Sequence, residues 1–345
     1  MSKHVRARAP LRISLAGGGT DIKEFSDIYG GAVLNIAITK YAFADIELIE
    51  DGFIAKASDL KEEIFIKIDN ADKFPNTIKN ELILHWHTYK YVMDVYNDGV
   101  FLPSKIITYC DSPMGSGLGS SSALVVCMLK GWSELLNLGL DEYVIARNAI
   151  QIERGICRFE GGQQDQYSAA FGGINFIEFN KDNNIVHPLK IKKWFKNELE
   201  TSLLLHFTGI SRFSGQIIND QIKIMQQVNK EKIIVLNNLR DNAFKMKNAF
   251  LKNSTQNIIE LLRESRILKS STSHKIESNL IKERIQFGLE EGALCAKVSG
   301  AGGGGFILFF TDPINSILLR EKLRGYNENT FLIQFCDESS QAWSL

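Results

Sequence analysis

The chain has 345 residues, and its 40 lysines and arginines balance 40 aspartates and glutamates, so its formal net charge is zero. Apolar residues make up 44% and charged residues 23%, as in an ordinary globular protein with one large or two moderate domains. This neutral balance argues against a protein that coats nucleic acid or an anionic membrane. The five cysteines stand singly, and we expect reduced, mostly buried thiols.

The first ten residues are basic, but no apolar stretch of signal-peptide character follows them. No apolar run in the sequence approaches the roughly 20 residues that span a bilayer. We therefore expect a cytoplasmic protein.

The first half of the chain alternates apolar strands with helical patterns. Residues 32–49 predict one or two strands, and a helical pattern covers residues 77–97. Residues 105–110 predict a strand that leads into a loop rich in glycine and serine. Residues 123–136 then predict a mostly buried helix, and residues 141–156 a second one.

A glycine-bearing loop follows, then helix to residue 170 and a strand at 174–179. Residues 180–200 are polar and rich in lysine and asparagine, and they mark the predicted domain boundary. Beyond them we expect a strand at 202–207 and several helices between 213 and 291. The Lys- and Glu-rich stretches of those helices are interpreted as solvated faces on core helices.

A last pair of strands, residues 306–310 and 330–336, is predicted to close the chain. Strands and helices are intermixed, without a fixed-period repeat. The predicted class is therefore α+β, with two lobes.

Glycine is concentrated in three short segments, residues 17–21, 115–122 and 300–305. In the middle one, glycines allow backbone N–H groups to converge on an anion, and the following helix adds its unpaired N–H groups and positive end. Its serines can cap those amides or reach a phosphate-bound Mg²⁺. Strand, loop and helix together predict a phosphate-binding loop; the alternative is a serine-capped helix after a tight turn.

Two other phosphate-binding motifs are excluded. A Walker A loop requires a Gly-Lys dipeptide, which the sequence lacks. Gly300, Gly302 and Gly305 match the dinucleotide fingerprint, but an apolar strand follows them where that fingerprint requires a helix. This polarity argues against a nicotinamide dehydrogenase and leaves a simple glycine-rich turn as the alternative for the third segment.

With all three segments in view, the chain resembles the GHMP kinases, the family of galactokinase, homoserine kinase, mevalonate kinase and phosphomevalonate kinase. Residues 9–21 match the first family motif, residues 113–121 match the phosphate-loop motif position for position, and residues 297–304 match the third. The resemblance implies the two-lobed α+β GHMP kinase fold. Its N-terminal lobe, ribosomal-protein-S5-like, would cover residues 1–190, and its ferredoxin-like C-terminal lobe residues 200–345.

Within the family, residues 8–21, 159–167 and 208–214 are most similar to kinases of D-glycero-D-manno-heptose 7-phosphate. This similarity implies ATP-dependent phosphorylation of the anomeric hydroxyl to give the 1,7-bisphosphate, for nucleotide-activated heptose and bacterial surface polysaccharide. The alternatives are a family member acting on a free sugar such as fucose or galactose, and a catalytically silent sugar or nucleotide sensor.

The cofactors implied by the resemblance are ATP and Mg²⁺. The expected partners are small-molecule substrates, ATP and a sugar phosphate, with neither nucleic acid nor membrane, and we allow for a homodimer.

The resemblance implies that two residues act at the transfer centre. Asp165, in the catalytic loop 159–167, would accept the proton of the attacking hydroxyl or orient that hydroxyl. Arg12 would stabilise the Asp165 carboxylate and the transferring phosphoryl group, but it cannot be a base because guanidinium stays protonated. The alternatives are a helix-capping aspartate and a strand arginine in a surface ion pair.

The phosphate loop, residues 113–122, is expected to hold the phosphates of ATP. Its expected binding residues are Pro113, Gly115, Ser116, Gly117, Leu118, Gly119, Ser120, Ser121 and Ser122. Ser121 and Glu153 would ligate Mg²⁺, although the run of three serines leaves the register open by one. An exposed helix carboxylate beside Arg154 is the alternative for Glu153.

The pair Thr20-Asp21 resembles the sugar-holding pair of galactokinase. Asp21 would accept hydrogen bonds from neighbouring sugar hydroxyls, which indicates a polyol substrate. The alternative is a turn-forming aspartate after three glycines.

The phosphate already carried by the substrate requires a cation. Arg212 with Ser211 and Ser214 is the candidate, in competition with Arg6, Arg8, Lys40 and Arg158. The complete set of expected substrate-binding residues is Gly18, Gly19, Thr20, Asp21, Gly162, Asp165, Arg212, Gly302 and Gly303.

Overall fold

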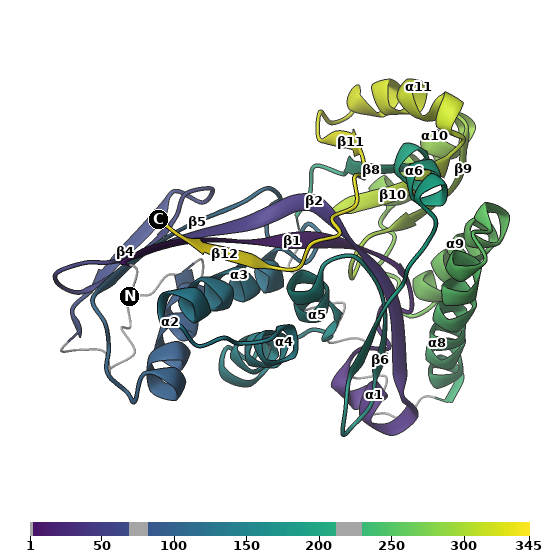
Figure 1. Cartoon of the computed structure of the whole chain (residues 1–345). Helices are drawn as coiled ribbons and strands as arrows, with labels where there is room; N and C mark the ends of the chain where they lie inside the picture. The colour runs from purple at the N-terminus through teal and green to yellow at the C-terminus, as the bar shows by residue number, and fades with distance from the viewer. Residues whose placement is uncertain (1–2, 69–81, 212–229) are drawn as a thin grey trace.

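The structure is a computed structural model that describes residues 3–68, 82–211 and 230–345 (Figure 1). Its strands are β1 (His4–Ala16), β2 (Gly31–Leu48), β3 (Phe53–Ala57), β4 (Glu62–Ile66), β5 (Ser104–Cys110), β6 (Ile174–Phe179), β7 (Ile185–Pro188), β8 (Leu203–Phe207), β9 (Ala293–Val298), β10 (Phe306–Thr311), β11 (Thr330–Leu332) and β12 (Gln341–Ser344).

The helices are α1 (Lys23–Tyr29), α2 (Ile83–Tyr96), α3 (Ser120–Leu135), α4 (Glu142–Ile150), α5 (Gln164–Phe171), α6 (Lys193–Ser202), α8 (Lys230–Leu251), α9 (Thr255–Ser270), α10 (Asn279–Glu290) and α11 (Pro313–Arg324). A turn of π-helix, η3 (Gln151–Ile156), continues α4.

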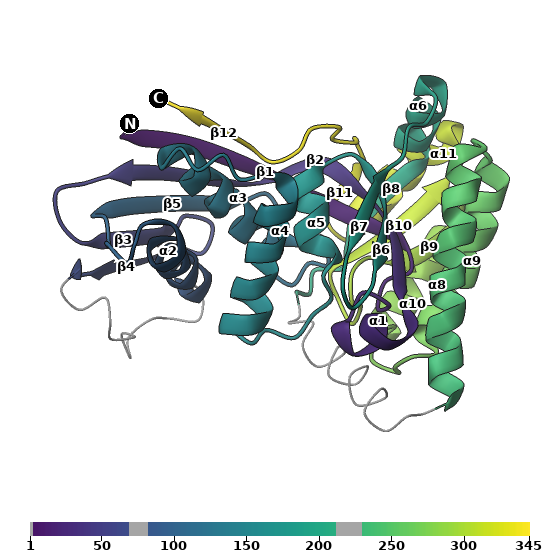
Figure 2. The same cartoon turned by 60° about the horizontal axis from the view of Figure 1, so that its bottom comes forward.

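The larger sheet is built on β1 and β2, a long antiparallel pair. Its strand order is β12-β1-β2-β5-β3-β4, with β6 and β7 added beside β2. Residues 9–16 and 31–38 of the central pair are buried at every position, whereas the outer half of β2 alternates. Since side chains alternate between the faces of a strand, helices must cover both faces at this point. Helices α3 and α5 pack on β1 there, and so do α8 and α9 (Figure 2).

The smaller sheet has the order β11-β8-β10-β9, and all of its strands are antiparallel. Apolar side chains of β8, β9 and β10 form a separate core with α10 and α11. The loop between β9 and β10, residues 299–305, is the third glycine segment. It joins two antiparallel strands, so the predicted strand after this segment is confirmed.

The last strand returns from the smaller sheet to the larger one. β12 pairs with β1, and Leu345 N donates to His4 O at 3.0 Å, so the two ends of the chain lie side by side (Figure 2). The prediction that residues 330–336 close the chain as a strand is wrong, because β11 ends at Leu332 and β12 follows.

The predicted α+β class is confirmed, and the strand at 174–179 has the predicted bounds. Residues 180–200 are more ordered than a linker, because β7 lies there and α6 begins there. The division at residues 190–200 stays a prediction. In the described part of the chain, no helix is both long and apolar enough to cross a membrane. All five cysteines are free thiols, and four of them are buried.

Candidate active site

The phosphate loop, residues 113–122, connects β5 to α3. Gly115, Gly117 and Gly119 have φ values of 74°, 83° and 77°, a left-handed backbone that glycine adopts without strain. Gly119 is the N-cap of α3, and no side chain caps the helix there. The predicted alternative of a serine-capped helix is therefore wrong. Because the first N–H groups of a helix have no intrahelical acceptor, this end of α3 suits an anion.

Hydroxyl groups inside the loop fix its shape. Ser116 is wholly buried, and its Oγ accepts from Ser112 Oγ at 2.8 Å and lies 3.3 Å from Ser120 Oγ. Ser120 Oγ also donates to Pro113 O at 3.3 Å. These two serines hold the loop together, and Leu118 anchors it in the core.

The loop between β9 and β10 supports the phosphate loop from the smaller sheet. Ser299 Oγ donates to Gly117 O at 3.0 Å, and Phe306 N donates to Ser116 O at 3.0 Å. A Cβ on Gly300 would lie 2.6 Å from Gly117 Cα, so the two backbones meet without a side chain between them. The candidate site thus lies where the two sheets join.

The three serines at the start of α3 have different surroundings. Ser120 and Ser122 are buried, whereas Ser121 Oγ donates to Glu153 Oε1 at 2.9 Å. Glu153 belongs to η3, is wholly buried, and also accepts from Gln166 Nε2 at 2.5 Å. Of the three registers that the serine run allows, the structure brings Ser121 to Glu153. The alternative of an exposed carboxylate is wrong.

Arg12 reaches Asp165 from β1. Its Nε and Nη2 donate to Asp165 Oδ1 at 2.8 and 2.6 Å, and its Nη1 donates to Gly117 O at 2.5 Å. The Arg12 side chain is only 5% exposed, so the alternative of a surface ion pair is wrong. Asp165 lies in the first turn of α5. A Cβ on Gly119 would lie 3.4 Å from Asp165 Oδ2, so this carboxylate oxygen is adjacent to the start of α3.

The first glycine segment holds Asp21 against the loop before α5. Asp21 Oδ1 accepts from Gly19 N at 3.0 Å, and Oδ2 accepts from Gln164 N at 3.1 Å. Gly162 packs on the same carboxylate, because a Cβ there would lie 1.9 Å from Asp21 Oδ2. The local bond to Gly19 N matches the turn-forming alternative, and the bond to Gln164 N adds a link to the first turn of α5. Asp21 is 2% exposed.

The hydroxyl of Thr20 is occupied by backbone. Thr20 Oγ1 lies 2.8 Å from Gly17 O and 3.0 Å from Ala32 O, which share its one hydrogen, and it accepts from Ala32 N at 3.1 Å. Thr20 therefore fixes the turn that carries Asp21, and its role in sugar binding stays a prediction.

Gly302 and Gly303 pack against the segment between α9 and α10. Gly303 N donates to Ile276 O at 2.8 Å, and a Cβ on Gly302 would lie 2.9 Å from Ile276 Cγ2. Both have positive φ values, of 100° and 80°. This contact explains the two glycines structurally, and their role in substrate binding stays a prediction.

The candidate cation for the substrate phosphate, Arg212, lies outside the described residues, and so does Ser214. Of its competitors, Arg6 is bonded to Asp45 and Arg8 to Glu338, both at 2.8 Å.

Arg158 is exposed and lines a pocket beside the catalytic loop, together with Lys23, Arg147, Arg154 and Lys181. The remaining competitor, Lys40, lies over the ring of Phe331.

Sequence reasoning missed two buried lysines, Lys269 and Lys297. Lys269 is 7% exposed and lies on the buried stripe of α9, four residues after Ser265. The interpretation of these helices as carrying only solvated charges is therefore wrong for Lys269. A lysine at helical spacing within an apolar stripe was the signal that could have revealed it. Burial lowers the pKa of Lys269 to about 8 and that of Lys297 well below its usual range.

Comparison with known families and proteins agrees with this geometry. Residues 83–173 match the model described as GHMP kinases N terminal domain, and residues 246–329 match GHMP kinases C terminal. The chain is 35% identical to D-glycero-alpha-D-manno-heptose 7-phosphate kinase of Campylobacter jejuni, over 99% of this chain and 100% of that protein. It is 26% identical to the bifunctional fucokinase/GDP-fucose pyrophosphorylase of Arabidopsis thaliana, over 94% of this chain and 32% of that protein.

Among solved structures, the fold is similar to that of a D-glycero-D-manno-heptose 1-phosphate kinase from Bacteroides thetaiotaomicron. The TM-score is 0.80 and the identity 33%, with 99% of each chain covered. The geometry and the family matches agree with one another. The phosphate loop lies at the start of α3 with the Arg12–Asp165 pair beside it, and the two family models match in the expected order. The chain belongs to the GHMP kinase family, whose members are ATP-dependent kinases of small molecules.

Proposed function

We propose that the protein phosphorylates the anomeric hydroxyl of D-glycero-D-manno-heptose 7-phosphate with ATP and releases the 1,7-bisphosphate. The observation that carries the proposal is the Arg12–Asp165 pair next to Gly119, where the phosphate loop meets α3. The two relatives named as heptose phosphate kinases, at 35% and 33% identity, support the sugar. Their names differ in the position of the phosphate, so the substrate needs a direct test.

The phosphates of ATP would lie on residues 113–122, against the first N–H groups of α3. In phosphoryl transfer the protein mainly positions the reactants and neutralises charge, and an uncapped helix start with a left-handed glycine backbone does both. Because Ser116 and Ser120 bond within the loop, backbone amides are the groups left to bind phosphate oxygens.

Ser121 and Glu153 are the proposed Mg²⁺ ligands. Their oxygens are of the hard type that Mg²⁺ prefers, and they lie 2.9 Å apart. Glu153 is wholly buried, and the nearest cation in the described part of the chain is Arg154, at 3.9 Å. A bound cation would compensate this buried carboxylate. Mg²⁺ in this position would neutralise charge on the β- and γ-phosphates.

Asp165 is the proposed acceptor of the sugar proton. Arg12 binds only Oδ1, so Oδ2 is the oxygen available to the attacking hydroxyl. As the hydroxyl oxygen forms its bond to the γ-phosphorus, its proton passes to Oδ2 and ADP leaves. Arg12 fixes the carboxylate and places a positive charge beside the transferring group.

Asp21 is the proposed acceptor for other sugar hydroxyls, since a carboxylate only accepts hydrogen bonds. Its link to Gln164 N places this carboxylate within one residue of the catalytic Asp165 along the chain. A phosphate on the anomeric carbon can attack a nucleoside triphosphate, with pyrophosphate leaving, so the product suits a role in nucleotide-activated heptose for surface polysaccharide.

The test is ATP turnover with Mg²⁺ against a panel of acceptors. It should contain heptose 7-phosphate, heptose 1-phosphate, free heptose, fucose, galactose and mevalonate, with ³¹P NMR to locate the new phosphate. We expect the highest kcat/KM with heptose 7-phosphate and a new signal at the anomeric position. Preferential turnover of a free sugar, or of heptose 1-phosphate, would overturn the substrate assignment.

A further inference from the structure

Two lysines are buried where the sheets join, and they differ in the number of acceptors around them. Lys297 Nζ donates to Ser14 O at 3.2 Å, Leu15 O at 2.8 Å and Ser265 Oγ at 3.3 Å. An ammonium group has three N–H donors, so Lys297 is fully paired. Lys269 Nζ has one hydrogen-bond acceptor among the described residues, a carbonyl oxygen of the β9–β10 loop. Two of its donors are therefore available to a ligand.

Other polar groups converge on the same small space above Gly18. A Cβ on Gly18 would lie 3.4 Å from Lys269 Nζ, 3.4 Å from Ser14 Oγ and 3.7 Å from Gln164 Nε2. Ser14 and Gln164 are 4% and 8% exposed. Within the described part of the chain, Ser14 Oγ and Gln164 Oε1 have no hydrogen-bond partner. Because buried polar groups are almost always paired, this cluster points to a polar ligand.

The charges around Lys269 indicate which ligand chemistry fits. Burial has the largest effect on its pKa; Arg12 on β1 lowers the pKa further, and Asp21 and Asp165 raise it. Lys297 on β9 is a further titratable neighbour, and its own pKa is lowered by burial and by Lys269. A phosphate group here would be repelled by the carboxylates of Asp21 and Asp165. A sugar hydroxyl can accept from the ammonium group and donate to a carboxylate, so a polyol fits this mixture of charges.

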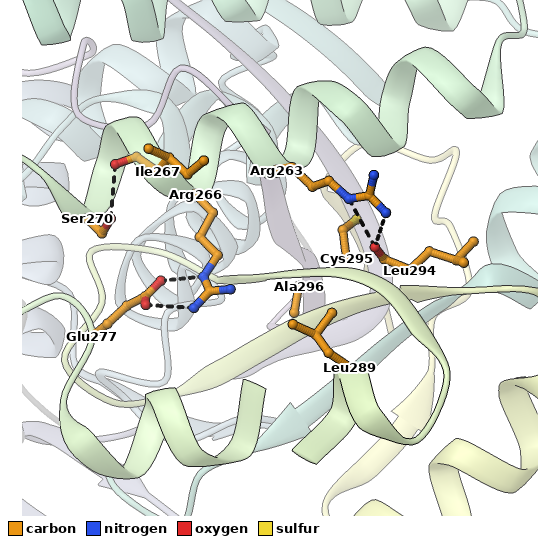
Figure 3. Close-up of a pocket in the computed structure, with 9 residues that line it drawn as sticks. All are labelled: Arg263, Arg266, Ile267, Ser270, Glu277, Leu289, Leu294, Cys295 and Ala296. Carbon is orange, nitrogen blue, oxygen red and sulfur yellow. Dashed lines mark hydrogen bonds and ion pairs between the residues drawn. The ribbon is translucent and has the colours of Figure 1, made fainter. Parts of the chain in front are cut away.

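The end of α9 that carries Lys269 is anchored on two sides. Arg263 donates to Leu294 O from Nε at 3.1 Å and from Nη2 at 2.6 Å. Arg266 pairs with both carboxylate oxygens of Glu277 at 2.8 and 2.9 Å. Figure 3 shows these two arginines reaching from α9 to β9 and to the segment before α10. Anchoring of this kind holds a binding side chain in a fixed position.

We propose that the ammonium group of Lys269 binds the acceptor sugar, donating hydrogen bonds to hydroxyl groups beside the one that reacts at Asp165. The inference rests on the proposed function and deepens it, because it adds a cation to the sugar site. Ser14 and Gln164 offer further polar atoms to the sugar, and Gly18, which has no side chain, leaves room for it.

The test compares steady-state kinetics of wild type, Lys269→Met and Lys269→Gln with the acceptor that wild type uses. Loss of a charged hydrogen-bond donor predicts a drop of about 10- to 100-fold in kcat/KM for the acceptor, with KM for ATP within threefold. In wild type, kcat/KM for the acceptor should fall as pH rises through about 8, since the group then loses its proton. Both variants should lack this step.

Gly18→Ala serves as a second variant with little risk to the fold. Its Cβ makes ordinary contacts with Lys269, Ser14 and Gln164 and enters the proposed ligand space, so KM for the acceptor should rise at least tenfold. The matched control is Lys245→Met, an exposed lysine on α8, for which we expect kinetics within twofold of wild type.

The outcomes separate the two proposals. If wild type turns over a sugar acceptor but the Lys269 variants keep its acceptor KM and its alkaline step, this inference is wrong and the proposed function stands. A rise in KM for ATP alone would also overturn it, since that result assigns Lys269 to loop support. If wild type turns over no sugar in the panel, both proposals fail.

Discussion

Lys269→Met should leave the folded protein as stable as wild type, or more so. A buried lysine is normally an unfavourable residue, because the fold must take its charge out of water. In Lys269, this penalty appears as a pKa lowered from 10.5 to about 8. Methionine has a side chain of similar length without the charge.

The magnitude follows from the pKa. Each pKa unit corresponds to 1.36 kcal/mol, so at pH 7 the protonated side chain costs the fold about 3 kcal/mol relative to its neutral form. Methionine removes this penalty and loses the hydrogen bond to Gly300 O, which is worth about 1.5–3 kcal/mol for a charged donor. The free energy of unfolding should therefore change by between about 0 and +2 kcal/mol.

The difference in unfolding free energy between Lys269→Met and wild type also depends on pH. Since the folded pKa lies below the unfolded one, the unfolded state binds more protons between pH 8 and 10.5. Wild type therefore gains stability from this group as pH rises through that window, by about 1 kcal/mol between pH 7 and 9. The Lys269→Met variant has no such gain, so the difference between the two proteins should shrink.

Urea unfolding without ligands at pH 7 and pH 9 measures both quantities, with Lys245→Met as the exposed control. Titrating groups away from Lys269 are common to wild type and variant, so their effects cancel in the difference. A loss of 3 kcal/mol or more at pH 7, or a difference that does not change with pH, would refute the reasoning. It would mean that the charge of Lys269 stabilises the fold by itself.

Three further changes test the rest of the site. Asp165→Asn should lower kcat by about 10²–10⁴-fold with little change in fluorescent nucleotide binding; normal turnover would exclude Asp165 as proton acceptor. Glu153→Gln should raise the Mg²⁺ concentration for half-maximal activity at least about tenfold in a metal titration, and an unchanged curve would contradict the ligand assignment. Gly117→Ala places a Cβ 2.5 Å from Ser299 O, so KM for ATP should rise and Tm should fall. Gly139→Ala has a similar φ of 62° but no neighbour within 4 Å, and it should lower Tm less without affecting KM.

The elements that could be predicted from the sequence are those whose pattern is local. The strand at 174–179 is mostly apolar, follows two glycines and is followed by polar residues, and its predicted bounds are those found. β12 has four residues and little apolar character, and it is a strand only because β1 offers it an edge. Such a strand depends on tertiary pairing that no local pattern contains.

The same distinction holds within the site. Segments 17–21 and 113–122 could be predicted from the sequence. Their turns need a left-handed backbone, which shows directly as closely spaced glycines. The serine register could not be settled from the sequence, since only the burial of Glu153 on η3 selects Ser121. Lys269 was missed because the charged groups that act on it, Arg12, Asp21 and Asp165, lie more than 100 residues away in the chain. Within its own helix, only its place on the buried stripe of α9 distinguishes Lys269 from the solvated charges there.

The contact between Gly117 and the β9–β10 loop has a consequence for folding during synthesis. Ser299 and Gly117 are 182 residues apart in the chain. Synthesis proceeds from the N-terminus, so the phosphate loop emerges from the ribosome long before Ser299 does. Contacts of such long sequence separation form late, because closing the intervening chain costs entropy first. A growing chain therefore cannot complete the phosphate loop and its support early, and the candidate site is assembled only once the second sheet has folded.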